Sequence, residues 1–230
     1  MIENAVYEAH GGSYLAFCNI FLITMFVGSV IAGWRMNGKT FRGYGLLLKD
    51  CSYQANFIHD YGIGITWINL GVYGLMMTGW FDLVIILTDG AGFTGATCGI
   101  VLAAMTFAAS GQQPRNVAPI LVGYMTLSLL VTLLCGAAGR APSWTLSTQG
   151  YMNGLAFATG LCPFSGKYGW KAGVLAGFLS AVMCTTTSVM HGGFVLYNGG
   201  LTAGIAALIL LPLLDLYESH AVSYGRGKGL

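Results

Sequence analysis

The stretch that decides the fold is residues 90–119, which read GAGFTGATCGIVLAAMTFAASGQQPRNVAP. Its first half consists of small and apolar residues and favours a helix inside a membrane. The one charged residue of the whole stretch is Arg115, in the second half. Ser110, Gly111 and Pro114 follow. A helix should stop there, because proline lacks a backbone N–H and glycine favours a turn. The stretch therefore predicts an apolar helix that breaks at its end.

The whole chain shares this shortage of charge. Of its 230 residues, 55% are apolar and 8% are charged, 35 are glycine, and the mean hydropathy is +0.69. A soluble domain carries about 25% charged residues, so these charges cannot cover a water-facing surface. Crossing a bilayer core takes about 20 residues, and six charge-free runs are long enough, the last for two crossings: Ala9–Trp34, Tyr61–Phe81, Gly90–Pro114, Asn116–Gly139, Ala141–Gly166 and Ala172–Leu214.

A second interrupted stretch is residues 147–170, STQGYMNGLAFATGLCPFSGKYGW, whose helix we expect to end between Gly160 and Gly166, around Pro163. Broken backbone survives at membrane depth only where it is buried in protein or lines a wet cavity. We expect Ala91–Gly111 and Gly150–Gly166 to dip into the membrane from opposite sides and to meet near its midplane. Many transporters and channels build a solute site from two such opposed half-helices.

The placement of the charges indicates in which direction each remaining span crosses the membrane, because basic residues favour the cytoplasmic side. With two dips and five spans, nine of the ten Lys and Arg lie inside and only Arg115 lies outside. We therefore predict an all-α integral membrane fold with about five transmembrane helices plus two re-entrant or broken helices. The spans are about 14–34, 61–81, 117–136, 169–188 and 194–214.

This arrangement predicts a multi-pass protein of the inner (plasma) membrane, with the N-terminus outside and the C-terminus in the cytoplasm. Residues 1–13 form an extracytoplasmic segment, 14–216 a single polytopic membrane domain, and 217–230 a polar C-terminal tail. Glycines at four-residue spacing, such as Gly169, Gly173 and Gly177, let membrane helices approach closely and need no functional role.

Two segments share a pattern of His, Gly and Asn: HDYGIGITWINLGVYG around Asn69 and HGGFVLYNGGLTAG around Asn198. An amide inside an apolar helix needs a partner, so each asparagine either bonds loop backbone and holds a half-helix in place or contacts a passing solute. His59 and His191 are expected at span ends, as interfacial side chains, as gating or proton-handling groups, or as haem ligands. Together with the two breaks, the pattern gives a candidate solute pathway of Asn69, Gly111, Pro114, Asn116, Pro163, His191, Asn198 and Thr202.

Catalytic and metal-binding patterns are missing from the sequence. It shows no nucleophile beside a base, no phosphate loop, no Rossmann turn, and no His, Cys and carboxylate set at ligand spacing. We therefore expect no enzyme, no cofactor, no metal site and no nucleic-acid partner. The charge-free runs contain no carboxylate, whereas proton-coupled pumps place Asp or Glu at membrane depth. That favours a small neutral or anionic solute, or uncoupled conduction.

Five stretches carry a family resemblance: MNGKTFRG (36–43), IGITWINLGVYG (63–74), SGQQPRNVAPILVG (110–123), GWKAGVLAGFL (169–179) and MHGGFVLYNGGLTAGIAALILLPLLD (190–215). Over about 35–217 the chain resembles the bacterial membrane family known as domain of unknown function 1576, most specifically in the last stretch. The resemblance implies a polytopic membrane protein without an established activity, here similar to the second half of longer members. Gln112 and Gln113 stand where the family often has Gly-Lys, and Asn56 where it has Asp.

Two hypotheses for function remain at this point. The first is a channel or facilitator subunit for a small polar solute, with a pathway formed by the two opposed segments. The second is a non-transporting structural or assembly subunit of a larger membrane complex, in which the glycines serve only packing. Besides the lipid bilayer, we expect the partner to be a parallel homo-oligomer or a paired, related membrane subunit.

Overall fold

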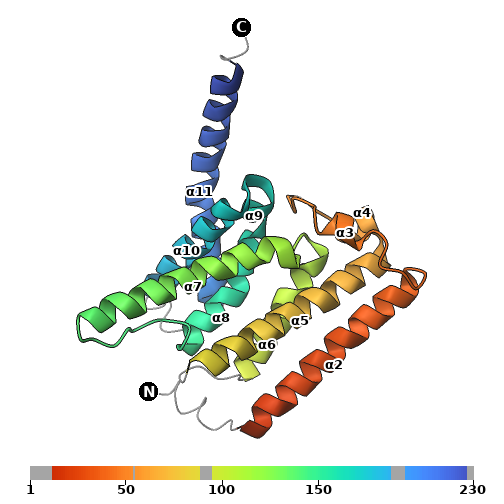
Figure 1. Ribbon diagram of the computed structural model, residues 1–230, viewed down its shortest axis with the longest axis horizontal. Helices are drawn as coiled ribbons and strands as arrows, with labels where there is room; N and C mark the ends of the chain where they lie inside the picture. The colour runs from red at the N-terminus through yellow and green to blue at the C-terminus, as the bar shows by residue number, and fades with distance from the viewer. Residues whose placement is uncertain (1–11, 54, 89–94, 188–194, 227–230) are drawn as a thin grey trace.

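The computed structural model describes residues 12–53, 55–88, 95–187 and 195–226 (Figure 1). Every regular element in these ranges is helical. Four of the described helices are long and apolar enough to cross a membrane, so the chain is an all-α multi-pass membrane protein. The elements are α2 (Gly12–Met36), α3 (Tyr44–Leu47), α4 (Phe57–Tyr61), α5 (Ile63–Leu87), α6 (Gly95–Met105), η1 (Thr106–Ala109), α7 (Pro114–Ala137), α8 (Gln149–Ala158), η2 (Thr159–Leu161), α9 (Cys162–Tyr168), α10 (Trp170–Thr187) and α11 (Val195–Arg226).

Helices α2, α5, α7, α10 and α11 occupy the five predicted span positions. All but α10, which has 18 residues, are among the four long apolar helices. Helix α5 continues past the predicted span limit at 81 and includes Asp82. Helix α2 supplies the partner of this carboxylate: Asn19 Nδ2 donates to Asp82 Oδ1 at 2.8 Å.

Helices α2 and α5 form an antiparallel pair held close by glycines. The backbone of α2 at Gly33 touches the start of α5 at Gly64, and Asn19 bonds to Asp82 near the other end of the pair. A Cβ added at Gly71 would lie 2.5 Å from the carbonyl oxygen of Phe26. The two backbones therefore approach each other as closely as glycine permits.

Helices α7 and α10 form a second close pair, but this pair is parallel. A Cβ at Gly123 would lie 2.3 Å from Val174 O, and nearer the start of both helices a Cβ at Gly173 would lie 2.9 Å from Pro119 Cβ. Farther along both helices, the Tyr124 hydroxyl contacts Ser180 Oγ at 3.2 Å. Both helices therefore begin at the same end of the molecule.

The two predicted broken helices are present, and they run in the same direction. The first is α6 followed by η1, and the second is α8 followed by η2 and α9. Near their starts, Thr97 Oγ1 donates to Asn153 Oδ1 at 3.1 Å. Beyond their 3₁₀ turns, Thr159 Oγ1 contacts Gln112 Oε1 at 3.4 Å. The prediction that the two segments oppose each other was wrong, because these contacts align their starts and their ends.

The same geometry also changes the end of the bundle at which Arg115 lies. The first broken helix ends beside the start of α5, where Gln113 Nε2 donates to Leu48 O at 3.1 Å. Arg115 therefore lies at the same end of the bundle as Lys49, not at the opposite end as the charge count had placed it. We call this the basic end; it carries Arg35, Lys39, Arg42, Lys49, Arg115, Lys167 and Lys171.

Helix α11 is the longest helix, with 32 residues. It packs antiparallel to α10, since Ser180 lies near Thr202 and Lys167 Nζ pairs with Asp215 Oδ1 at 3.2 Å. The helix continues to Arg226, beyond the predicted domain limit at 216, and its C-terminal part stands clear of the other helices (Figure 1).

Candidate functional site

The first helix break is a short polar loop buried inside the protein. Gly111 has φ +112°, a left-handed conformation that favours glycine, and a Cβ there would lie 3.0 Å from Ser52 O. Gln112 and Gln113 are buried. Pro114 then starts α7 at a position where its missing N–H costs nothing.

Asn116 ties this loop together. Its Nδ2 donates to Gly111 O at 2.8 Å and also to Ser52 Oγ, and its Oδ1 accepts from the Gln113 N–H at 3.0 Å. The Arg115 N–H donates to Gln113 Oε1 at 2.8 Å. These bonds satisfy N–H groups that the first turn of a helix leaves unpaired. The predicted site residues Gly111, Pro114 and Asn116 are therefore one structural unit.

Asn69 holds the same loop from α5. Its Nδ2 donates to Ala108 O at 3.0 Å and to Gln112 O at 2.8 Å. One turn farther along α5, the Tyr73 hydroxyl donates to Gln112 Oε1 at 2.6 Å. Asn69 was expected either to bond loop backbone or to contact a solute. These hydrogen bonds correspond to the first role. Its Oδ1 is buried without a partner among the described residues.

The second helix break lies against the first. Pro163 stands in the first turn of α9, so it starts a helix where the sequence predicted an end; the preceding η2 turn absorbs the interruption. Cys162 Sγ points to Gly111 O at 3.8 Å. Gly166 packs so closely that a Cβ would overlap Cys51 O. The two predicted breaks therefore meet, at the basic end.

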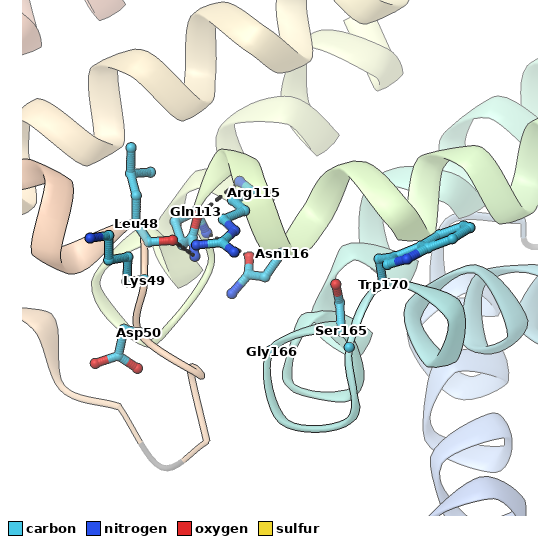
Figure 2. A pocket seen from close by; sticks show the side chains of 10 residues that line it. Leu48, Lys49, Asp50, Gln113, Arg115, Asn116, Ser165, Gly166 and Trp170 are labelled. Atoms are coloured by element: carbon cyan, nitrogen blue, oxygen red, sulfur yellow. Dashed lines mark hydrogen bonds between the residues drawn. The ribbon is translucent and has the colours of Figure 1, made fainter.

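A cavity of about 420 Å³ opens where they meet (Figure 2). Its walls come from the segment after α3, the start of α7, the end of α9 and the start of α10. Gly111 and Pro163 lie next to it but do not line it. The lining residues are Leu48, Lys49, Asp50, Gln113, Arg115, Asn116, Ser165, Gly166, Gly169 and Trp170.

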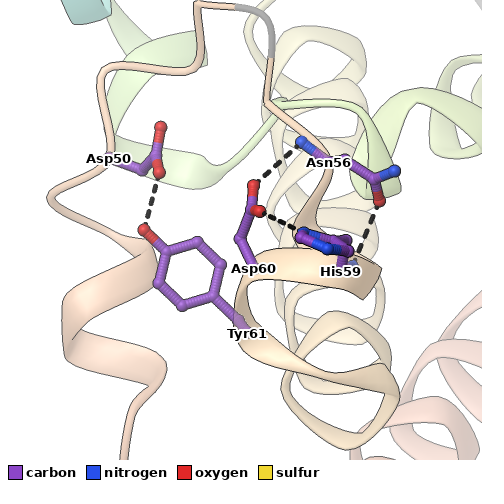
Figure 3. Close-up of polar contacts among 5 residues, drawn as sticks. All are labelled: Asp50, Asn56, His59, Asp60 and Tyr61. Carbon is purple, nitrogen blue, oxygen red and sulfur yellow. Dashed lines mark hydrogen bonds and ion pairs between the residues drawn. The ribbon is translucent and has the colours of Figure 1, made fainter.

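The cavity has an excess of positive charge. Arg115 and Lys49 are exposed, and neither side chain forms an ion pair within the described ranges. The one acid, Asp50, is already engaged: Oδ2 accepts from the Tyr61 hydroxyl and Oδ1 from the Ser52 N–H, both at 2.6 Å. Figures 2 and 3 show its carboxylate turned from Arg115 toward α4. Partial burial, and then this bond to Asp50, raise the pKa of Tyr61 to about 12, so its proton stays in place.

Comparison with known proteins gives a family and no further relatives. The family described as "Protein of unknown function (DUF1576)" matches residues 36–216, which include both breaks and the whole cavity wall. The chain belongs to this family. No curated protein and no solved structure matches it.

Not all predicted site residues of this DUF1576 member lie at the cavity. Thr202 is buried between helices, where its Oγ1 donates to Gly199 O at 3.1 Å and contacts Ser180 at 3.4 Å. The backbone of Asn198 belongs to α11, but its side chain and the whole of His191 lie outside the described residues. No group of three His, Cys, Asp or Glu that could hold a metal ion occurs in the described part of the chain.

His59 lies outside the cavity, on the exposed helix α4. Its Nδ1 pairs with Asp60 Oδ1 at 2.9 Å, and its N–H donates to Asn56 Oδ1 at 3.2 Å (Figure 3). The hydrogen bond with His59, and then the Asn56 N–H, lower the pKa of the Asp60 carboxyl. Asn56, which stands where the family has Asp, is thus the N-terminal cap of α4.

Sequence reasoning missed Lys49, Ser165 and Trp170 as cavity residues. The signal available for Ser165 was its place two residues after Pro163 in the second break. Lys49 carried no such signal, since it comes from a segment 64 residues before Gln113. Only the folded chain brings the two together.

Proposed function

We propose that this protein is a channel or facilitator subunit for a small polar solute, with its entrance at the cavity. The observation that carries the proposal is the meeting of the two helix breaks at one polar, positively charged cavity. Close helix packing needs no breaks, whereas a solute site gains from exposed helix ends. In this proposal the two side-by-side breaks take the place of the opposed re-entrant pair.

Buried polar side chains continue from the cavity into the helix bundle. Behind the loop lie Asn69, Tyr73, Gln112 and Thr159, all buried. Two further buried sets lie between the helices: Tyr124, Ser180 and Thr202, and Thr97 with Asn153. Polar groups inside a membrane protein are costly and mark solute pathways more often than surfaces that face lipid. In the described conformation these groups bond to one another, so the pathway is closed beyond the cavity.

The orientation and assembly are part of the proposal. Because basic residues favour the cytoplasm, the basic end faces inside, and so does the end of α11 at Arg226. Many apolar side chains on α2, α7 and α11 are exposed, among them Ile20, Leu133 and Leu208, and they face lipid or a further subunit. The partner we favour is a parallel homo-oligomer or a related membrane subunit.

One observation favours the rival, a non-transporting assembly subunit. The side-chain amides of Asn69 and Asn116 donate to loop backbone and to Ser52. Holding the loop in this way explains both asparagines without any contact to a solute. In that case the breaks shape an interaction surface, and the molecule conducts nothing.

Flux through purified protein in liposomes separates the two. A panel of small neutral and anionic solutes should equilibrate faster across vesicles that contain the protein than across empty vesicles. The matched variants are Thr159→Val and Thr126→Val: both remove a hydroxyl at nearly constant volume, one buried behind the loop and one exposed on α7. Thr159→Val should alter the flux and Thr126→Val should not. Absence of flux for every solute from an intact oligomer leaves the assembly role.

A further inference from the structure

A region of the cavity wall has hydrogen-bond donors without acceptors. Helix α10 begins at Trp170, and its first three N–H groups, on Trp170, Lys171 and Ala172, have no acceptor within the described ranges. At the start of α7 the equivalent groups are used internally, by Gln113. The N-terminus of α10 is therefore the open one, and Gly169 and Trp170 place it on the cavity.

Ser165 supplies the second, independent observation. Its side chain lines the cavity, the residue is only 8% exposed, and its hydroxyl forms no hydrogen bond with the described residues. Figure 2 shows this hydroxyl directed into the space between Asn116 and Trp170. The hydroxyl opens onto the cavity while the rest of the residue is buried, so it can bond to a group that occupies the cavity.

The charge around these donors selects the ligand. Arg115 and Lys49 line the cavity from two different segments and have no counter-ion among the described residues. Asp50 is engaged by Tyr61 and Ser52. Unpaired N–H groups at a helix start, a free hydroxyl and two bases form an environment that favours an oxyanion. The volume, about 420 Å³, is that of a pocket that also admits an organic portion of the ligand.

We propose that this cavity binds a phosphate group, held by the N-terminus of α10, Ser165 and Arg115, with Lys49 at the rim. The proposal rests on the proposed function in one respect: it names the class of solute, a phosphate or phosphate ester, that would enter there. The same chemistry is also offered by the headgroup of an anionic phospholipid.

Binding is measured on the full chain in an uncharged detergent, by calorimetric titration with inorganic phosphate. Ser165→Ala and Arg115→Gln should each weaken binding, the latter by about tenfold or more, since it removes a charge-assisted contact. Arg42→Gln is the matched control, because Arg42 is an exposed base of the same basic end that does not line the cavity. An equal loss in Arg42→Gln would show diffuse electrostatics and overturn the proposal.

A second arm identifies the source of the phosphate. Protein in nanodiscs that contain phosphatidylglycerol is examined by native mass spectrometry for retained lipid. Retention that depends on Arg115 and Ser165, without binding of free phosphate, assigns the cavity to a lipid headgroup. If the unmodified chain unfolds cooperatively on heating, which shows that it is folded, and binds neither free phosphate nor phosphatidylglycerol, the site is refuted.

The two proposals fail separately. Phosphate binding without flux of any solute supports the site and ends the channel proposal. Flux of neutral solutes that is unaffected by Arg115→Gln, with no phosphate bound, supports the channel and ends this inference.

Discussion

Two pairs of helices in this molecule use glycine in the same way and differ in everything else. In the α2–α5 pair, Gly71 lies against the backbone of Phe26; in the α7–α10 pair, Gly123 lies equally close to the backbone of Val174. Only the second pair follows the broken helices and opens onto the cavity: α7 begins at the first break, and α10 begins after α9. Glycine-rich packing therefore does not distinguish the candidate site. The distinguishing feature is that helix ends come together there inside the protein.

The largest effect should come from adding a methyl group at either packed glycine. Gly123→Ala places a Cβ 2.3 Å from Val174 O, and the backbones must separate, which costs about 1–3 kcal/mol of stability. Thermal unfolding in detergent measures the loss. Gly136→Ala in the same helix is the control, because nothing lies within 4 Å of a Cβ there.

The comparison of the two pairs predicts the same result for the α2–α5 pair. Gly71→Ala should destabilise about as much as Gly123→Ala, with Gly79→Ala as its neutral control in α5. If only the α7–α10 substitution lowers stability, then the two pairs do not share one packing device.

A smaller effect is expected where α5 reaches the broken region. Asn69→Ala removes the donor to Ala108 O and Gln112 O and leaves two buried carbonyls with one partner fewer, at a cost of about 2 kcal/mol. Hydrogen exchange at residues 108–113 should speed up, while exchange in α2 stays unchanged. Equal acceleration in α2 would show that Asn69 supports the α2–α5 pair instead.

The start of α7 offers a milder test. Asn116→Ala removes the acceptor of the Gln113 N–H, which is one half of the capping box whose N-cap is Gln113, and should cost about 1 kcal/mol. Because Asn116 also bonds to Ser52, exchange should rise at both 111–116 and 50–53. A change confined to α7 would mean that the loop after α3 is held by other contacts.

The smallest effect concerns pH and lies away from both pairs. The Asp60 carboxyl has a lowered pKa in the folded chain, so its contribution to stability is present above the unfolded value, about 3.9, and is lost as the pH falls through the lower folded value. His59→Ala should move the Asp60 titration back toward the ordinary range, as followed by the NMR signal of its ¹³C-labelled carboxyl. An unmoved midpoint would assign the shift to the Asn56 N–H alone.

Much of this organisation could be predicted from local sequence. Charge-free runs gave the long helices, and Gly111, Pro114 and Pro163 gave the two breaks. Those features depend on a few neighbouring residues, as does the capping box of Gln113 and Asn116. Burial of the breaks in protein was also expected, because broken backbone needs protein around it. The place where they meet was not: the prediction put them near the midplane from opposite sides, and the structure joins them side by side at the basic end.

The direction of the broken helices could not be obtained in this way. If both segments cross once and the last run crosses twice, Arg140 replaces Arg115 as the single base on the far side, and the count of nine in ten is unchanged. Charge placement therefore cannot distinguish the two arrangements. Contacts between distant residues, such as Thr97 with Asn153, decide between them. The same holds for Lys49 and Ser165, which only the tertiary fold brings to one cavity.

The shared direction of the two broken helices limits how this molecule can work. Helices α6 to α7 and α8 to α10 are two units built in the same order: a short helix that breaks, a turn at a glycine with positive φ (Gly111 and Gly169), and a long helix back. Transporters made of inverted repeats switch by exchanging the conformations of their two halves, so that the inward-facing and outward-facing states mirror each other. Parallel units are not related by such an exchange. An exchange of conformation between these two units would therefore not carry the cavity from the basic end to the opposite end of the helices.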